Sequence, residues 1–246
     1  MMQMNRWKLR HGRKSALMVM GCILISLAVS KQVSAQEIDS RLPERTQKDV
    51  IEKWNQWMKP ALPQEDPFIE KPTSQFPYQV GKLQESYLQE GVDSANFYRF
   101  IAGLPSDLTL DDELNNKAQF GAILLAATGK LNHYPSQPAD MPEETYKRGK
   151  DSTSSSNLFE TFNSNENILR KSVRAYMDDS DLSNIDRLGH RRWILNPGLQ
   201  KIGFGLAFRV EKDGEKSFFS PMQVLDRVAR ISPIITRCIP AKEHFL

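Results

Sequence analysis

Cysteine is nearly absent from this chain of 246 residues, which contains only Cys22 and Cys238. Cys22 lies in an N-terminal segment that we expect to be removed, so Cys238 remains alone. A single cysteine cannot form a disulfide bond within one chain, which excludes a small disulfide-stabilised domain. We assign Cys238 a structural role. Stability must come from an apolar core, and the length suffices for one domain with an extension.

A hydrophobic run long enough to cross a membrane is also missing. The apolar stretch at residues 15–30 follows five basic residues and precedes the small residues Val33-Ser34-Ala35. This order predicts a secretory signal peptide over residues 1–35, and the mature chain is expected to have no transmembrane span. The protein is thus predicted to be secreted or held in the cell envelope. The competing interpretation is a lipoprotein acylated at Cys22, in the sequence VMGC.

Excess positive charge is absent from the predicted mature chain. The whole sequence has a formal net charge of +3, and residues 1–35 contain six basic and no acidic residues, which leaves +3 − 6 = −3. A protein of this charge is not expected to bind nucleic acid.

Catalytic signatures are missing as well. The chain has four histidines and contains no H-E-x-x-H motif, no G-x-S-x-G motif and no Cys-His-Asn signature. No catalytic signature therefore supports a hydrolase.

Residues 36–82 are polar and rich in proline, and we interpret them as an N-terminal arm. One helix is predicted inside it, because apolar residues recur at helical spacing from Val50 to Met58 and Pro60 ends the run. Trp54 and Trp57 lie in this helix. The favoured interpretation is that both tryptophans dock on the main domain, and the alternative is a glycan-binding platform.

Residues 83–246 carry the pattern of a globular domain. Helices are predicted over 84–102, from Thr109 to Gly129, and from Asn163 to the break at Asp178-Asp179-Ser180. The tract DSTSSSN, residues 151–157, is predicted to be a loop. A strand at 202–210, the hairpin signal Asp213-Gly214 and an apolar run at 218–225 follow. Helices followed by paired strands predict an α+β domain with an antiparallel sheet.

The stretch from Gly189 to Gly205, GHRRWILNPGLQKIGFG, is the most informative in the chain. Asn196-Pro197-Gly198 is a turn sequence. After it, large apolar residues alternate with Gly203, Gly205 and Ala207, which predicts a strand whose bare face has a close neighbour. His190 precedes this turn on a short, tightly placed segment. Arg191 and Arg192 are expected to pair with Asp178, Asp179 or Asp181, and the alternative is that they bind an anionic ligand.

Four motifs together resemble a known family: LNHYP, SSNLF, AYMDD and the Gly189–Gly205 stretch. Over about residues 86–245 they are similar to the bacterial branch of the CAP superfamily of cysteine-rich secretory proteins, antigen 5 and pathogenesis-related proteins. The resemblance implies a three-layer α/β/α sandwich. Its central cleft would be lined by two histidines and two acidic residues that can hold a divalent metal.

The resemblance also implies site residues. His133 matches the first family histidine and His190 the second. Ser156 stands where the first family glutamate would precede Asn-Leu, Asp178 lies near the second, and Glu166 in NENI is an alternative match for the first. Two neutral imidazoles and a carboxylate suit Zn²⁺ or another divalent cation. With serine in place of one acid, we expect weak binding.

Three functions are compatible with these residues. The leading one is a binding module whose cleft holds a small or extended ligand, such as a cell-wall or lipid component. The second is a metal-dependent hydrolase or peptidase in which Asp178 or Glu166 helps His133 and His190 to activate a water. The third is a structural envelope protein that docks on a partner through its arm. The identity of the ligand is not encoded in a recognisable motif.

The signal peptide yields the first testable prediction. If signal peptidase cleaves after Ala35, the exported protein begins at Gln36. N-terminal sequencing of protein recovered outside the cytoplasmic membrane measures this directly. An exported form that starts at a lipid-modified Cys22 would contradict the prediction.

Overall fold

The computed structural model describes residues 45–58, 66–162, 166–182 and 184–224. Contacts divide the chain after Glu44, and all the described residues belong to the second unit, which begins at Arg45. The predicted signal peptide, Cys22 and Cys238 lie outside the described residues. In the described part of the chain, no helix is both long enough and apolar enough to cross a membrane.

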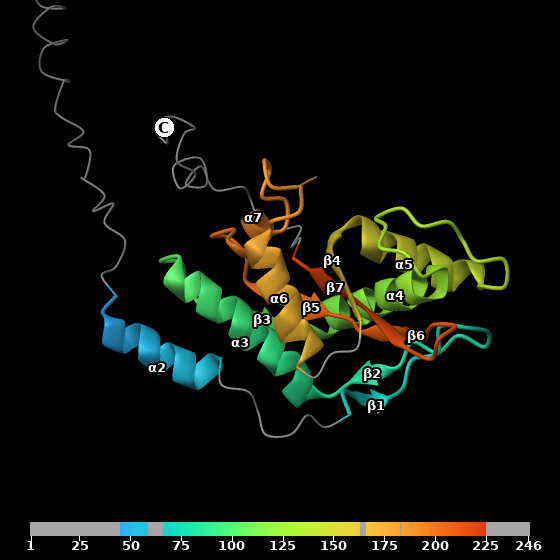
Figure 1. Cartoon of the computed structure of the whole chain (residues 1–246), viewed down its shortest axis with the longest axis horizontal. Coiled ribbons are helices and arrows are strands. Elements are labelled where there is room, and N and C mark those ends of the chain that lie inside the picture. The colour runs from blue at the N-terminus through green and yellow to red at the C-terminus, as the bar shows by residue number, and fades with distance from the viewer. Residues whose placement is uncertain (1–44, 59–65, 163–165, 183, 225–246) are drawn as a thin grey trace, which may run out of the picture. The chain divides into compact units, whose positions relative to one another are not determined.

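A mixed sheet forms the centre of this unit, and helices cover both of its faces (Figure 1). The helices are α2 (Gln47–Trp57), α3 (Glu85–Ile101), α4 (Asp112–Thr128), α5 (Glu143–Ser154), α6 (Ile168–Asp178) and α7 (Arg191–Ile194). The strands are β1 (Phe68–Glu70), β2 (Lys82–Leu83), β3 (Thr109–Leu110), β4 (Ser156–Phe162), β5 (Lys201–Phe204), β6 (Ala207–Val210) and β7 (Lys216–Gln223).

Strand β7 is the centre of the five-stranded sheet. It pairs antiparallel with β4, β5 and β6, and the sheet order is β3-β5-β7-β4, with β6 also joined to β7. Among the described strands, only β3 and β5 pair in parallel. The β6–β7 hairpin turns at Gly214, whose φ of 86° suits a residue without a side chain. The predicted hairpin at Asp213-Gly214 is therefore present.

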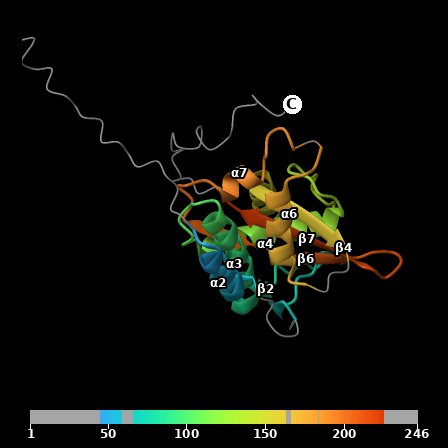
Figure 2. The ribbon, with the colours of Figure 1, turned by 60° about the vertical axis from the view of Figure 1, so that its left-hand side comes forward.

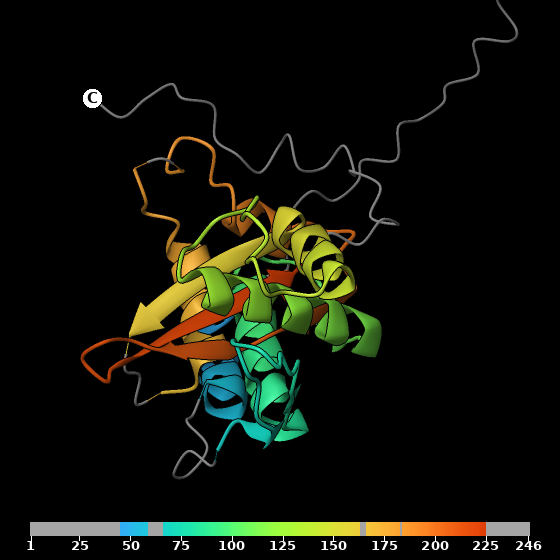
Figure 3. The same cartoon turned by 90° about the vertical axis from the view of Figure 1, so that its right-hand side faces the viewer.

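Two apolar cores, one on each face of the sheet, make the three layers. Because side chains alternate along β7, Phe219 faces the core beneath α4 and α5 while Met222 faces the core beneath α3 and α6. The view in Figure 3 shows α4 and α5 on one side of the strands and α3 and α6 on the other. The predicted α+β sandwich is confirmed.

Helix α4 lies unusually close to β5, as the bare strand face predicts. A Cβ atom on Gly203 would lie 2.3 Å from the main-chain carbon of Leu114, and one on Gly205 would lie 2.3 Å from the carbonyl oxygen of Ala118. Only glycine fits at this distance. The helix is held in register by Gln119, whose amide donates to the carbonyl oxygen of Leu206 and accepts from its N–H.

The region around α5 corrects the sequence prediction. The tract DSTSSSN is not a loop, because α5 continues to Ser154 and β4 begins at Ser156. Small residues allow this, since a Cβ on Gly121 of α4 would lie 2.3 Å from the hydroxyl of Ser152, which is fully buried. Close packing of two helices thus overrides the local preference of serine for turns.

Two helix starts are also corrected, and one predicted strand is divided. Helix α4 begins after Asp111, whose carboxylate accepts from the N–H groups of Glu113 and Leu114, while Thr109 belongs to β3. The N-cap of α6 is Asn167. The strand predicted at 202–210 is interrupted between β5 and β6.

Helix α2 lies beside α3, as the views in Figures 1 and 2 agree. Thr46 and Asp49 form its capping box. Its two tryptophans make edge contacts with α3: the ring centroids of Trp54 and Phe97 are 5.4 Å apart, and those of Trp57 and Phe100 are 6.3 Å apart. The pair docks on the main domain, although Trp54 is still half exposed.

Arg99 fixes the turn between α7 and β5 from inside the protein. Its side chain is fully buried, and Nη1 donates to the carbonyl oxygens of Ile194 and Asn196, each at 2.8 Å. Nε donates to the carbonyl oxygen of Pro105 at 2.7 Å. Burial lowers the pKa of Arg99. The predicted Asn-Pro-Gly turn is therefore tied to α3.

The approach of α4 to β5 generates a stability prediction. Gly205→Ala forces the backbone of α4 away from the strand and should lower the free energy of unfolding by about 3 kcal/mol. Gly214→Ala is the control, because open space surrounds that position and only its positive φ opposes alanine. It should cost about 1 kcal/mol. Urea denaturation measures both, and equal losses would show that α4 yields without strain.

Candidate functional site

Asp179, at the C-terminal end of α6, is the central residue of the site. Asp179 ends the helix in the left-handed conformation, with φ of 50°, and its side chain is completely buried. Oδ2 of its carboxylate accepts from the main-chain N–H groups of His190 and Arg191, both at 3.1 Å. Oδ1 accepts from the amide of Asn184 and from His190 Nδ1. The buried charge is thus fully paired, and it joins α6 to the start of α7.

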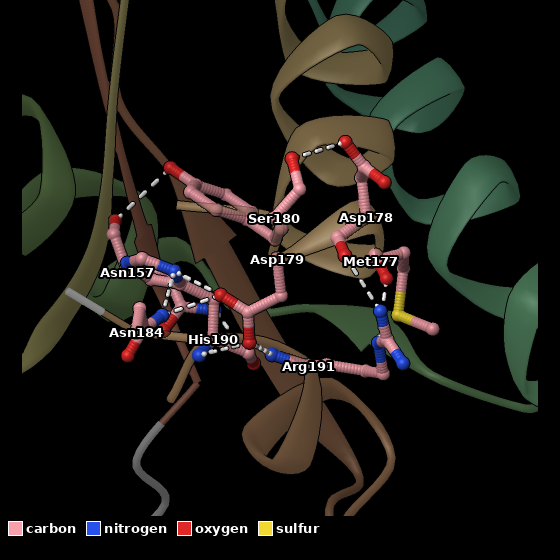
Figure 4. A network of polar contacts seen from close by, with 9 residues as sticks. Asn157, Met177, Asp178, Asp179, Ser180, Asn184, His190 and Arg191 are labelled. Atoms are coloured by element: carbon pink, nitrogen blue, oxygen red, sulfur yellow. Dashed lines mark hydrogen bonds and ion pairs between the residues drawn. The ribbon is translucent and has the colours of Figure 1, made fainter. Parts of the chain in front are cut away.

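His190 is oriented by this carboxylate (Figure 4). Its Nδ1 lies 2.8 Å from Asp179 Oδ1 and 2.8 Å from the Asn184 amide nitrogen. Because an ionised carboxylate can only accept, the contact with Asp179 places the proton on Nδ1, and in the neutral ring the lone pair is on Nε2. In this tautomer the Asn184 amide, itself a donor to Asp179, is a close neighbour of Nδ1 and not its hydrogen-bond partner. Among the described residues, Nε2 has no hydrogen-bond partner, and the side chain is 28% exposed.

Tyr176 supports the same ring. Its ring centroid lies 5.4 Å from that of His190 at an interplanar angle of 32°, and its hydroxyl reaches the carbonyl oxygens of Asn157 at 3.1 Å and Ser220 at 2.7 Å. Burial raises the pKa of Tyr176 well above its ordinary value, so the hydroxyl stays protonated as a donor. Asn157 completes the frame, since its amide donates to the carbonyl oxygen of His190 at 3.2 Å.

Arg191 has a role that differs from the expected one. Its guanidinium donates to main-chain carbonyl oxygens at the end of α6, those of Met177 and Asp178, both at 2.6 Å. It closes the C-terminus of that helix instead of pairing with an acidic side chain. Asp178 itself is exposed, and its carboxylate accepts from the hydroxyl of Ser180 (Figure 4). Arg192 lies over the ring of Trp193.

His133 is held in a comparable way at the end of α5. Its Nδ1 lies 2.7 Å from the carbonyl oxygen of Thr153, and the Thr153 hydroxyl donates to the carbonyl oxygen of His133 at 3.0 Å. A carbonyl oxygen accepts only, so Nδ1 carries the proton here too, and Nε2 holds the lone pair of the neutral ring. The residue is exposed.

Both histidine segments attach to one corner of the fold. Thr153 holds His133 and Asn157 holds His190, and these two anchors are four residues apart at the junction of α5 and β4. The structure thus brings together the two segments that the sequence singled out. Over the described residues, no group of three or more histidine, cysteine, aspartate or glutamate side chains is arranged to hold a metal ion.

Ser156 lies at this corner and is buried. Its hydroxyl donates to the carbonyl oxygen of Ser152 at 2.8 Å and accepts from the amide of Gln223 at 2.6 Å. Glu166 lies elsewhere. It precedes α6 and binds Arg174 through both carboxylate oxygens, at 2.8 and 3.1 Å. The main chain rises by about 16 Å along the eleven residues of α6, which lie between Glu166 and the end of the helix at Asp178. The carboxylate of Glu166 is engaged by Arg174, and among the described residues no hydrogen bond or ion pair joins it to either histidine of the site.

Sequence reasoning misses the residues that orient the histidines. It predicts Asp179 only as a partner for arginine, and it does not single out Asn157, Tyr176 or Asn184. One signal is available for Asp179. The helix pattern ends at Asp178-Asp179, so an aspartate is expected at the C-cap, where its carboxylate can accept from N–H groups of the segment that follows.

Comparison with known proteins gives one family match. The family model "CAP: Cysteine-rich secretory protein family" matches residues 92–219, just over half of the chain. Among solved structures, MpPR-1i is similar with 18% identity and a TM-score of 0.37, over 55% of this chain and 83% of that one. An outer surface protein from Borrelia burgdorferi gives 19% identity and a TM-score of 0.33, over 58% of this chain and 95% of that one. No curated protein matches.

The buried carboxylate generates a prediction about the site. In Asp179→Asn, one side-chain oxygen becomes an NH₂ group that faces donors in either orientation, so the free energy of unfolding should fall by about 3 kcal/mol. Asp178→Asn is the matched control, because that carboxylate is exposed, and it should change stability by less than about 0.5 kcal/mol. Chemical denaturation measures both. Equal stabilities of the two variants would show that the Asp179 contacts do not hold the corner.

Proposed function

Because this chain belongs to the cysteine-rich secretory protein (CAP) family, whose domains are typically extracellular, we propose that it is a secreted or cell-envelope binding module. Its site is the corner that anchors His133 and His190, where a divalent cation or a small ligand would bind. Export through residues 1–35 is part of the proposal, and so is the absence of nucleic acid among its partners.

One observation carries this proposal. In both histidines, Nδ1 donates to a fixed acceptor, the carbonyl of Thr153 in one and the carboxylate of Asp179 in the other. Histidines that bind metals are held in this way, because the second nitrogen is then aimed and available. Zn²⁺ accepts imidazole nitrogen readily, and water or a ligand would fill the remaining positions. With Ser156 in place of a carboxylate, binding should be weak.

A metal-dependent hydrolase or peptidase is the alternative, and the His190–Asp179 pair favours it. A histidine backed by a buried carboxylate can accept a proton from water. In this alternative the carboxylate that helps the histidine to activate a water is Asp179, and not Asp178 or Glu166. Within the described residues, no serine hydroxyl bonds to Nε2 of His190, so the attacking group would be water.

Zinc titration tests the proposal. Isothermal calorimetry on the mature protein should detect weak Zn²⁺ binding that is lost in His133→Ala and in His190→Ala. Binding should also weaken when the pH is lowered to about 5.5, because only neutral imidazole binds a metal. Ser156→Glu should tighten binding by adding a carboxylate at the corner, and Ser156→Gln is its uncharged control.

The possible outcomes separate the alternatives. Binding that survives both alanine substitutions would remove the two histidines from the site. Binding only in Ser156→Glu would mean that the natural chain keeps the frame without the metal. Hydrolysis of a peptide library by the zinc-loaded protein, lost in His190→Ala, would favour the hydrolase.

A further inference from the structure

The outer edge of β4 is an open strand edge. This strand ends the sheet order β3-β5-β7-β4 and pairs along all seven of its residues with β7 alone. In the part of the chain that the structure describes, no backbone hydrogen bond joins β4 to any other segment. An antiparallel strand directs about half of its N–H and C=O groups away from its neighbour. Because Ser156, Asn157 and Leu158 are buried, the part of this edge that can accept another strand runs from Phe159 to Phe162.

A groove lies beside this edge, on the side of α6. Its volume is about 770 Å³, and its lining contains apolar residues from α3, β4 and α6 together with charged residues from α6 and α7: Tyr98, Phe159, Ala175, Met177, Lys171, Arg174, Asp178 and Arg191. Lys171 links the groove to the strand, because its Nζ donates to the hydroxyl of Thr161 at 2.8 Å. Phe162, at the end of β4, is 57% exposed.

The charge in this groove is mainly positive. Arg174 is paired with Glu166, but Lys171 donates to a hydroxyl and Arg191 to carbonyl oxygens. Over the described residues, neither of these two cations forms an ion pair with a carboxylate. The one acid of the lining, Asp178, accepts from Ser180. A partner with negative charge would therefore be attracted.

The two faces of β4 differ in charge. Side chains alternate along a strand, so Phe159 and Thr161 face α6 and its cations, while Glu160 points to the opposite face. A strand added to this edge would place every second side chain beside Lys171 and the others beside Glu160. Acidic residues suit the first positions and uncharged residues the second.

We propose that the outer edge of β4 binds an extended acidic peptide of a partner protein as an additional strand. Main-chain hydrogen bonds to β4 hold the peptide, and alternate acidic side chains face Lys171 and Arg191. The groove is open and rimmed by cations, which suits a peptide backbone better than an acyl chain, whose apolar body needs an enclosed channel. This site uses neither histidine side chain and does not depend on the proposed metal binding, although Arg191 follows His190 directly and both bind Asp179.

Fluorescence anisotropy on the mature protein tests this inference with a labelled nine-residue peptide of alternating glutamate and valine. The peptide should bind, and replacing its glutamates by glutamine should weaken binding at least about tenfold. A peptide with the same sequence, N-methylated at every second amide, keeps the charge but cannot extend a sheet, and it should not bind.

Protein variants locate the site. Lys171→Glu places a like charge beside the peptide and should weaken binding at least about tenfold. Lys147→Glu makes the same change on α5, in the other helical layer, and should leave affinity within about twofold. Hydrogen exchange of the β4 amides should slow when the peptide is added.

Three results would overturn the proposal. Equal binding of the N-methylated peptide would exclude strand addition, and no change in anisotropy with any peptide would exclude this ligand class. Protein dimers in sedimentation equilibrium, with β4 amides already protected without peptide, would assign the edge to a second copy of the chain.

Discussion

The guanidinium of Arg99 is buried in the interior, and the positions of both the sheet and the site depend on its hydrogen bonds. Within the described residues no carboxylate forms an ion pair with it, and its guanidinium is satisfied by carbonyl oxygens of Pro105, Ile194 and Asn196. Nη2 also lies 3.5 Å from the carbonyl oxygen of Leu199, and such contacts compensate a buried cation for the water that it has lost. The loop after α7 is therefore held where those carbonyls converge. His190 precedes this loop and β5 follows it, so one side chain of α3 sets the position of both.

Asp179 is the corresponding anion. It is buried like Arg99, and it accepts from the N–H groups that open α7 and from the ring of His190. The buried carboxylate of Asp179 thus binds N–H groups at the start of α7, and the buried guanidinium of Arg99 binds the carbonyl oxygen of Ile194 at its end. Four residues would not form a stable helix alone, because few internal hydrogen bonds offset the ordering cost. The two buried charges supply the missing stabilisation.

The two histidines are oriented by different partners, but both rings have the same tautomer. A main-chain carbonyl orients His133 and a carboxylate orients His190, yet each neutral ring presents Nε2. The two partners differ in kind, because the carboxylate of Asp179 backs His190 and a neutral main-chain carbonyl backs His133. The corner at Thr153 and Asn157 is the element that sets the separation of the two histidines.

Much of the architecture could be read from the residues. Neighbouring residues predict helices α2, α3, α4 and α6, the Asn-Pro-Gly turn and a close neighbour at Gly203 and Gly205, and these predictions match the structure. The family resemblance is also confirmed. The tract DSTSSSN defeated the same reasoning because its helix is stabilised by contact with Gly121, a residue far away in the sequence. Both histidines could be chosen by resemblance. Their orienting partners could not, because Asp179 and Thr153 act through positions that only folding brings beside the rings.

By itself, the sequence determined the α+β class, the bare strand that admits α4, and the two histidines of the candidate site, because side-chain size, periodicity and motif are properties of neighbouring residues. The tertiary structure decided which carboxylate faces His190, that Glu166 binds Arg174, and that β4 ends the sheet. These facts depend on distances between segments, and such distances result from packing of the whole domain. Periodicity could not distinguish Asp178 from Asp179. A left-handed residue at the helix end buries one and exposes the other.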